Sequence, residues 1–248
     1  MASRWPSDYQ TSFGPGPITR GVRALIIVNV AVFLVTLAAP SAIIQLFGLS
    51  PRAVLEHGYV WQLGTYLFVH SPSSFTHILF NMLALWMFGV DLERRWGTRG
   101  FTRYYFLTGI GAGISVLLVS LLPFSAARMG YADVTIGASG SIYGLLMAWA
   151  LLFPDRRILF MFLFPLRTRT FVLLVGAIAF FSAMSASGGA VSNLAHLGGL
   201  LAGWLYLKGP KNLRLDLNYR LTRWRMERMR RRFNVHHGGR GNWEDRIH

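Results

Sequence analysis

The chain has 248 residues, of which 53% are hydrophobic and 14% charged, and its formal net charge is +15. The apolar content excludes a disordered chain, and uncharged stretches of this length are not those of a soluble nucleic-acid-binding domain. There is no Cys, which excludes disulfides, thiolate metal sites and a Cys nucleophile.

The expected elements follow from where charge is absent. Five stretches contain no Asp, Glu, Lys or Arg: 24–51, 57–90, 104–127, 134–154 and 170–207. A membrane-spanning helix needs about 20 mostly apolar residues, so 104–127 and 134–154 each predict one span. Residues 170–207 are too long for one crossing and divide at Ser185–Gly189 into two.

The remaining spans come from the first two stretches. One span is expected near 22–40, ending at Pro40, and a second over 74–90, with an aromatic, loop-like segment before it. The run Ile158–Leu166 is too short to cross and predicts an interfacial loop. The start of the chain has no apolar core, so no cleavable signal peptide is expected. The fold class is an all-α integral membrane protein with six spans.

The positive charges give an orientation. Six spans place both ends of the chain on one side, and cytoplasmic loops are enriched in Lys and Arg. With the N-terminus inside, 23 of the 25 Lys and Arg residues lie on the cytoplasmic side, and only Arg52 and Arg128 lie outside. The sequence therefore predicts a multi-pass protein of the cell (inner) membrane with cytoplasmic termini, and no nucleic-acid partner.

Few polar residues remain inside the spans, and such residues are costly there unless they have a function. The candidates are His77 and Asn81 in span 2, Ser139 in span 4, and Asn193 and His196 in span 6. Because spans 2, 4 and 6 run in the same direction, these groups are expected at similar depth near the outer face.

Their chemistry suits acyl transfer. Ser139 and His196 can form a nucleophile–base pair, and backbone N–H groups at the start of a helix can stabilise an oxyanion. His77 and Asn81 share a helix face and can donate hydrogen bonds towards it. No carboxylate lies inside a span, and Asp91 and Asp133 are expected in loops, which disfavours a Ser-His-Asp triad.

Glycine spacing favours close contact between spans 4 and 6. His196, Gly199 and Gly203 follow one another at offsets of three and four, and Gly140 and Gly144 offer a matching surface. Tyr143 lies one turn below Ser139 and can pack against the imidazole. Such glycine faces also occur where only packing is needed, and a Ser in a span often bonds to its own helix. Ser141 competes with Ser139 as nucleophile, although both cannot face His196.

These residues resemble the rhomboid family of intramembrane serine proteases. Three motifs in chain order carry the resemblance: His77-Ile78-Leu79-Phe80-Asn81, Gly137-Ala138-Ser139-Gly140 and His196-x-x-Gly199-x-x-x-Gly203. It extends from about residue 20 to 208 and includes Glu93–Gly97 and Pro154–Arg157. The resemblance implies a bundle of six transmembrane helices.

The resemblance also implies roles. Ser139 would be the nucleophile, His196 the general base and Tyr143 its support, with Asn81, His77 and the Ser139 N–H forming the oxyanion hole. Substrates would be transmembrane proteins cut near their outer ends, usually after a small residue and before a helix-weakening segment. The resemblance implies no metal or cofactor.

One position departs from the family pattern. Many relatives carry Trp-Arg in the first outer loop, where this chain has Trp61-Gln62. Trp61, Tyr66 and Phe68 suit an interfacial position. We expect the anchoring of the loop to differ, because an Arg contact to lipid phosphate is lost, and catalysis to persist.

The chain divides into a cytoplasmic segment (1–20), a protease core (21–208) and a basic tail (209–248). In the tail, Leu213, Leu217, Leu221 and Trp224 share one helical face among many Arg residues. This pattern predicts an amphipathic helix on anionic lipid headgroups, with a solvated or disordered tail as the alternative.

Two rival functions remain open from the sequence: a non-catalytic binder or scaffold for membrane proteins, and a small transporter with His77 and His196 as proton-relay groups. Ser139, His196 and Asn81 together disfavour the binder. The lack of carboxylates in the spans and of a visible inverted repeat disfavours the transporter. For the protease, the sequence predicts the Ser185–Asn193 segment as a lid and span 5 as a lateral gate.

Overall fold

A computed structural model describes residues 14–123, 130–160, 164–184 and 190–209. The chain divides after Leu207 into two units, and the description concerns the first. Its elements are α1 (Arg20–Ala38), α2 (Pro40–Phe47), α3 (Pro51–His57), α4 (Gln62–Thr65), the 3-10 turn η1 (Tyr66–Phe68), α5 (Phe75–Ser120), α7 (Ser139–Leu152), β1 (Arg157–Phe160), β2 (Phe164–Arg167), α8 (Thr168–Met184) and α9 (Ala190–Lys208).

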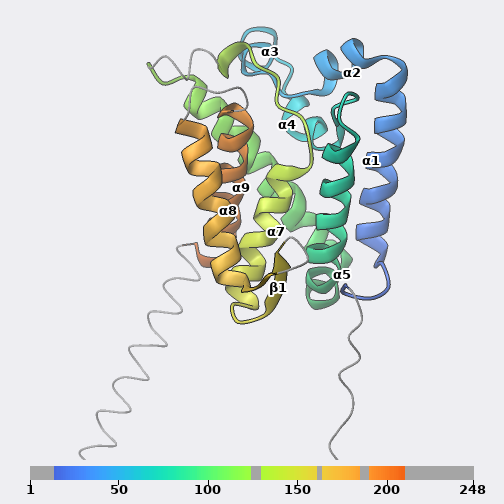
Figure 1. Ribbon diagram of the computed structural model, residues 1–248. Helices are drawn as coiled ribbons and strands as arrows, with labels where there is room; N and C mark the ends of the chain where they lie inside the picture. The colour runs from blue at the N-terminus through green and yellow to red at the C-terminus, as the bar shows by residue number, and fades with distance from the viewer. Residues whose placement is uncertain (1–13, 124–129, 161–163, 185–189, 210–248) are drawn as a thin grey trace, which may run out of the picture. The chain divides into compact units, whose positions relative to one another are not determined.

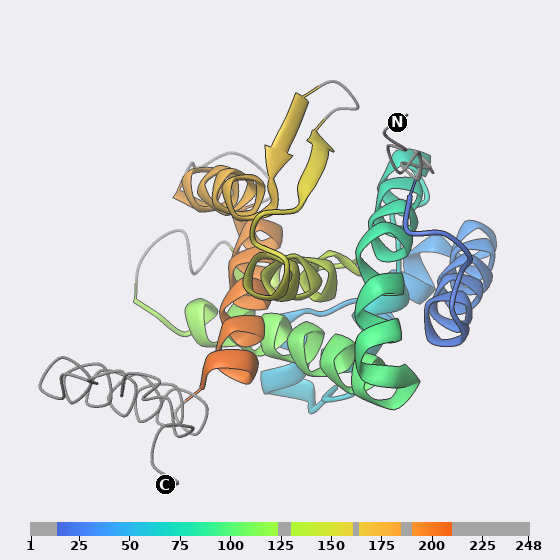
Figure 2. The same cartoon turned by 90° about the horizontal axis from the view of Figure 1, so that it is seen from below.

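Helix α7 lies at the centre of this unit. The two arms of α5, together with α8 and α9, surround it, and α1 packs on the outer side of α5 (Figures 1 and 2). The short helices α2, α3 and α4 lie at one end of the bundle and the β1–β2 hairpin at the other (Figure 1). The core between α5 and α7 is aromatic: Tyr104 and Tyr105 are fully buried, and the Trp149 indole donates a hydrogen bond to the Phe88 carbonyl.

Helix α5 contains two of the predicted spans. Its 46 residues run through the charged segment 91–103, which was expected as a loop. The helix is broken at Gly97, whose φ of 70° and ψ of 166° lie outside the helical region. A positive φ is accessible to glycine at little cost, so one residue is enough to separate the two arms.

Apolar side chains cover outward-facing surfaces of the bundle. Ile27 and Leu34 of α1, and Leu173 and Phe181 of α8, are each at least half exposed. Among the described helices, α1 and α5 are long and apolar enough to cross a membrane, and α7 and α8 are apolar but shorter. Helix length and composition alone therefore do not establish the six spans predicted from the sequence.

Three local expectations were wrong. The run 158–166 is not a loop: β1 and β2 pair antiparallel, with Arg157 opposite Arg167, which satisfies backbone groups of a segment too short to cross. The segment from 58 to 73, expected to be loop-like, contains the short helix α4 and the turn η1. Asp91 lies within α5, where it forms an ion pair with Arg156, because the helix continues past the expected boundary.

The Glu93 carboxylate holds the start of α1 against α5. It is 4% exposed and accepts hydrogen bonds from the Gly21 and Val22 amides at 2.8 and 2.9 Å, and from the Thr19 and Thr98 hydroxyls at 2.5 and 2.6 Å. The first amides of a helix have no partner within it, and a negative charge there is favourable. One side chain thus caps α1 and fixes it to α5.

We predict that Glu93→Gln lowers the free energy of unfolding by about 2 kcal/mol, because hydrogen bonds to a buried charge contribute about 1.5 to 3 kcal/mol. Reversible unfolding in mixed micelles measures it. Glu56→Gln is the control: the Arg52 hydrogen bond holds the pKa of Glu56 below its usual value, but this pair is exposed and the unfolding midpoint should not move. Equal midpoints for both variants would contradict the role of Glu93.

Candidate functional site

The site begins at the first residue of the central helix. Ser139 opens α7, and the turn before it depends on Gly137, whose φ is 116°. A Cβ at Gly137 would also lie 2.8 Å from Nε2 of His77, so both conformation and space require glycine. The Gly137 amide donates to the Tyr66 carbonyl at 3.0 Å, which fixes the turn. Ser139 therefore stands at a helix N-terminus with backbone N–H groups near its hydroxyl.

Ser139 and His196 are brought together from α7 and α9. Ser139 Oγ lies 2.8 Å from His196 Nε2, and the two side chains are partly buried. The Tyr143 ring is stacked on the imidazole, with centroids 4.2 Å apart and planes 1° apart. His196 lies about two turns into α9, which starts at Ala190, whereas Ser139 is the first residue of α7. Within the described residues, His196 Nδ1 has no hydrogen-bond partner, and the imidazole contacts the Ser139 hydroxyl and the Tyr143 ring.

Glycines make the approach of α7 and α9 possible. A Cβ at Gly199 would lie 2.0 Å from the Gly140 carbonyl oxygen, and one at Gly203 would lie 3.1 Å from the Gly144 carbonyl oxygen. The two backbones are therefore in direct contact. Tyr104 donates its hydroxyl hydrogen to the Gly144 carbonyl at 2.8 Å, which satisfies that group beside the contact. This packing sets the distance between Ser139 and His196.

His77 and Asn81 lie in the first two turns of α5 and face the same space. They line a pocket of about 470 Å³ together with Ser139, Tyr143 and His196. His77 Nδ1 accepts a long hydrogen bond, 3.5 Å, from the Ser71 amide. Asn81 Nδ2 donates to the His77 carbonyl at 2.7 Å, so one of its two N–H groups is used within its own helix, which the sequence did not indicate.

Ser141 points away from this pocket. Its side chain is fully buried, and Oγ donates to the Tyr105 carbonyl of α5 at 2.8 Å. A Cβ at Gly109 of α5 would lie 2.3 Å from the Ser141 Oγ atom, so this hydroxyl is enclosed between α7 and α5. Of the two serines considered from the sequence, Ser139 is the one beside His196.

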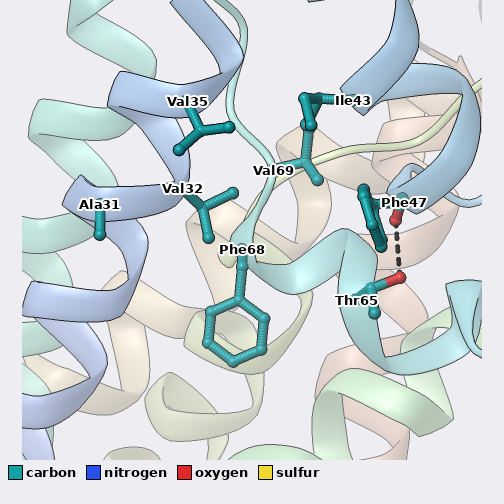
Figure 3. A pocket seen from close by; sticks show the side chains of 8 residues that line it. All are labelled: Ala31, Val32, Val35, Ile43, Phe47, Thr65, Phe68 and Val69. Atoms are coloured by element: carbon teal, nitrogen blue, oxygen red, sulfur yellow. Dashed lines mark hydrogen bonds between the residues drawn. The ribbon is translucent and has the colours of Figure 1, made fainter.

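A second pocket, of about 360 Å³, has a different character. It lies between α1, α2 and residues 65–69, and its lining is apolar (Figure 3). Its one hydroxyl, that of Thr65, donates to the Phe47 carbonyl at 2.9 Å. None of the eight residues that line it carries an ionisable side chain.

Two aspects of the site were missed or misplaced from the sequence. His70 is fully buried, with its ring centroid 5.1 Å from that of His77, and nothing in its loop-like context signals this contact. The predicted lid at 185–193 lies partly outside the described residues. Its last four positions are not a loop, because α9 begins at Ala190. Asp133 is exposed and does not line the pocket.

Comparison with known proteins identifies a family and several similar chains. The family model described as "Rhomboid domain" matches residues 57–209. Rhomboid protein 1, mitochondrial, of Saccharomyces cerevisiae is 35% identical over 137 residues, covering 55% of this chain and 38% of that protein. Rhomboid protease GluP of Bacillus subtilis is 32% identical over 158 residues, with 64% and 27% covered, and the putative rhomboid protease YdcA of the same species is 30% identical over 154 residues, with 61% and 67% covered.

The fold and the site thus define a helical membrane protein with a serine and a histidine at one pocket. The chain belongs to the rhomboid family, since the family model covers more than half of it. It spans about 38% and 27% of the lengths of the yeast and GluP relatives.

We predict that Gly199→Ala lowers the free energy of unfolding by about 3 kcal/mol, because the added methyl meets the Gly140 backbone, which cannot move aside cheaply. Gly176→Ala is the matched control in α8. Its Cβ would lie 3.3 Å from the flexible Leu200 side chain, and alanine favours a helix by about 0.5 to 1 kcal/mol. Unfolding in mixed micelles should separate the two variants. Equal effects would show that α7 and α9 are not held together as described.

Proposed function

We propose that the chain is an intramembrane serine endopeptidase in which Ser139 and His196 act as a catalytic dyad. The observation that carries the proposal is the 2.8 Å contact between Ser139 Oγ and His196 Nε2, in a pocket that His77 and Asn81 also line. His196 takes the hydroxyl proton as Ser139 attacks the scissile carbonyl, and returns it to the leaving amine. Water then attacks the acyl-enzyme. His196 takes a proton from this water and returns it to Ser139 Oγ as the carboxylic acid product leaves. The protease names of the GluP and YdcA relatives support this chemistry.

Charge on the substrate oxygen in the transition state is stabilised by three donors in this proposal. They are the Ser139 backbone N–H, the Asn81 amide and His77. Helix N-terminal amides and preorganised side-chain donors stabilise such an oxyanion in a site from which bulk water is excluded. The shared pocket supports these roles, and the stacked Tyr143 ring keeps the imidazole facing the nucleophile. The proposed reaction uses no metal or cofactor.

The proposed substrates are transmembrane proteins cut near the outer face of the membrane. In this topology the two arms of α5 are separate spans, and α1, α7, α8 and α9 are the other four. Both termini are cytoplasmic, as the placement of 23 of 25 Lys and Arg residues favours. The membrane is the inner membrane of a bacterial cell, and α8 is the gate through which substrate enters laterally. The pocket opens to the outside so that water reaches Ser139.

The proposed division of the chain is a cytoplasmic segment (1–20), a protease core (21–208) and a basic tail (209–248). The tail lies outside the described residues, apart from Gly209. Its Arg-rich composition and its apolar face at helical spacing support binding to anionic lipid headgroups of the inner leaflet.

A fluorophosphonate probe tests the proposed nucleophile. The purified protein should react at one residue, and Ser139→Ala and His196→Ala should each abolish the reaction, because the first removes the nucleophile and the second its base. Ser141→Ala is the control and should react like the unsubstituted chain, since its hydroxyl is bonded to α5. Labelling that persists in Ser139→Ala overturns the assignment, and a folded protein that takes no label favours a non-catalytic binder of membrane proteins.

A further inference from the structure

The outer segment between α2 and α3 pairs with the backbone that leads into α7. The Leu49 amide donates to the Thr135 carbonyl at 2.9 Å, and the Thr135 amide donates to the Leu49 carbonyl at 2.8 Å. Thr135 lies four residues before Ser139. The position of Leu49 therefore bears directly on the segment that carries the proposed nucleophile.

Gln62 holds this outer segment from both sides of Leu49. Its side chain is 0% exposed. Oε1 accepts a hydrogen bond from the Ser50 amide at 3.0 Å, and Nε2 donates to the Gln45 carbonyl at 2.9 Å, with Leu46 at 3.4 Å. A neutral amide has both a donor and an acceptor, so one side chain satisfies groups that precede and follow Leu49. At a fully buried position no water replaces these bonds, and a buried polar group left unsatisfied costs about 1 to 3 kcal/mol.

The neighbours of Gln62 in sequence make only part of this contact. Trp61 donates its indole N–H to the Leu46 carbonyl at 2.8 Å and is 45% exposed. Thr65 donates to the Phe47 carbonyl at 2.9 Å, as Figure 3 shows, from a position that is partly exposed. Both donate to carbonyl groups at the end of α2, and within the described residues neither side chain forms a hydrogen bond with residues 48–50. Gln62 alone of the three also bonds to Ser50, beyond Leu49.

We propose that Gln62 is a positioning residue for Ser139, acting through Ser50, Leu49 and Thr135. The proposal rests on the proposed function of Ser139 as the nucleophile. Gln62 fixes Leu49, and Leu49 fixes Thr135 by two backbone hydrogen bonds. The Gly137 amide, bonded to the Tyr66 carbonyl, completes the support two residues before Ser139. Many relatives have Arg at the position of Gln62, and from the sequence this change was expected to remove a contact with lipid. In the structure, Gln62 instead forms hydrogen bonds with the protein backbone.

The expected consequence is catalytic as well as structural. Displacing reacting atoms by about 1 Å can cost on the order of 10²-fold in rate, even when the change lies far from the chemistry. Loss of the Gln62 contacts frees the Leu49 segment without touching any residue of the pocket. A moderate displacement of Ser139 should therefore slow acylation by about 10-fold while the protein stays folded.

The test compares Gln62→Met, which keeps the length of the side chain and removes its polar atoms, with Thr65→Val, which removes a hydrogen bond to the same end of α2. Two quantities are measured below the unfolding temperature of each variant: the rate constant for fluorophosphonate labelling of Ser139, and amide hydrogen exchange over residues 134–139. Gln62→Met should label about 10-fold more slowly and exchange about 10-fold faster in this segment. Thr65→Val should stay within about twofold of the unsubstituted chain in both, because substitutions at exposed positions usually change the free energy by no more than about 0.5 kcal/mol.

An isosteric variant supplies a further control. Gln62→Glu keeps an acceptor for the Ser50 amide but places a carboxylate against the Gln45 and Leu46 carbonyls at a fully buried position. Because a buried, unpaired charge costs more than a lost hydrogen bond, both of its values should depart from those of the unsubstituted chain at least as far as those of Gln62→Met. Exchange over 134–139 that matches in Gln62→Met and Thr65→Val overturns the proposal. Because exchange needs no activity, it decides the role of Gln62 even if Ser139 takes no label, an outcome that would instead overturn the proposed function.

Discussion

The contact between the backbones of α7 and α9 is the constraint on which the rest of the site depends. Two glycines of α9 lie against carbonyl groups of α7, at distances that leave no room for a Cβ at Gly199. In lipid there is no hydrophobic force between helices, so close packing of small residues is a main source of their association. The contact fixes how deep each helix lies relative to the other. Ser139 and His196 occupy the same level because of it, and their 2.8 Å separation follows.

The other groups that contact Ser139, His196 and the backbone before Ser139 are uncharged. The Tyr143 ring, one turn below the serine, is stacked on the imidazole, and in the proposed mechanism it takes the orienting role that a carboxylate has in a Ser-His-Asp triad. On the other side of the serine, the preceding backbone pairs with the outer segment at Leu49, and Gln62 holds that segment. A buried carboxylate would be costly at this depth, whereas rings, amides and backbone groups are neutral. Glu93, the buried acid of the described residues, lies where α5 meets the start of α1, and its charge is stabilised by four hydrogen-bond donors.

The sequence predicted those parts of the site that have a periodic signature. Glycines at offsets of three and four, and polar residues isolated in apolar helices, point to Ser139, His196, His77 and Asn81 before any coordinates are known. The bridge between Leu49 and Thr135 joins segments that are 86 residues apart and leaves no periodic pattern. The buried state of Gln62 and His70 depends on such distant contacts, so it could not be predicted. The β1–β2 hairpin and the continuous helix α5 were missed for a related reason, since charge marks membrane boundaries and not the ends of secondary structure.

The central claim is that Ser139 and His196 act as one catalytic unit. It is tested most directly by comparing cleavage of a transmembrane substrate in proteoliposomes by Ser139→Ala, His196→Ala and the double variant. Residues that act as a unit show grossly non-additive effects, because removing either already removes the shared function. The account predicts that all three variants keep the same residual rate. A double variant whose rate falls by the product of the two single losses would contradict it.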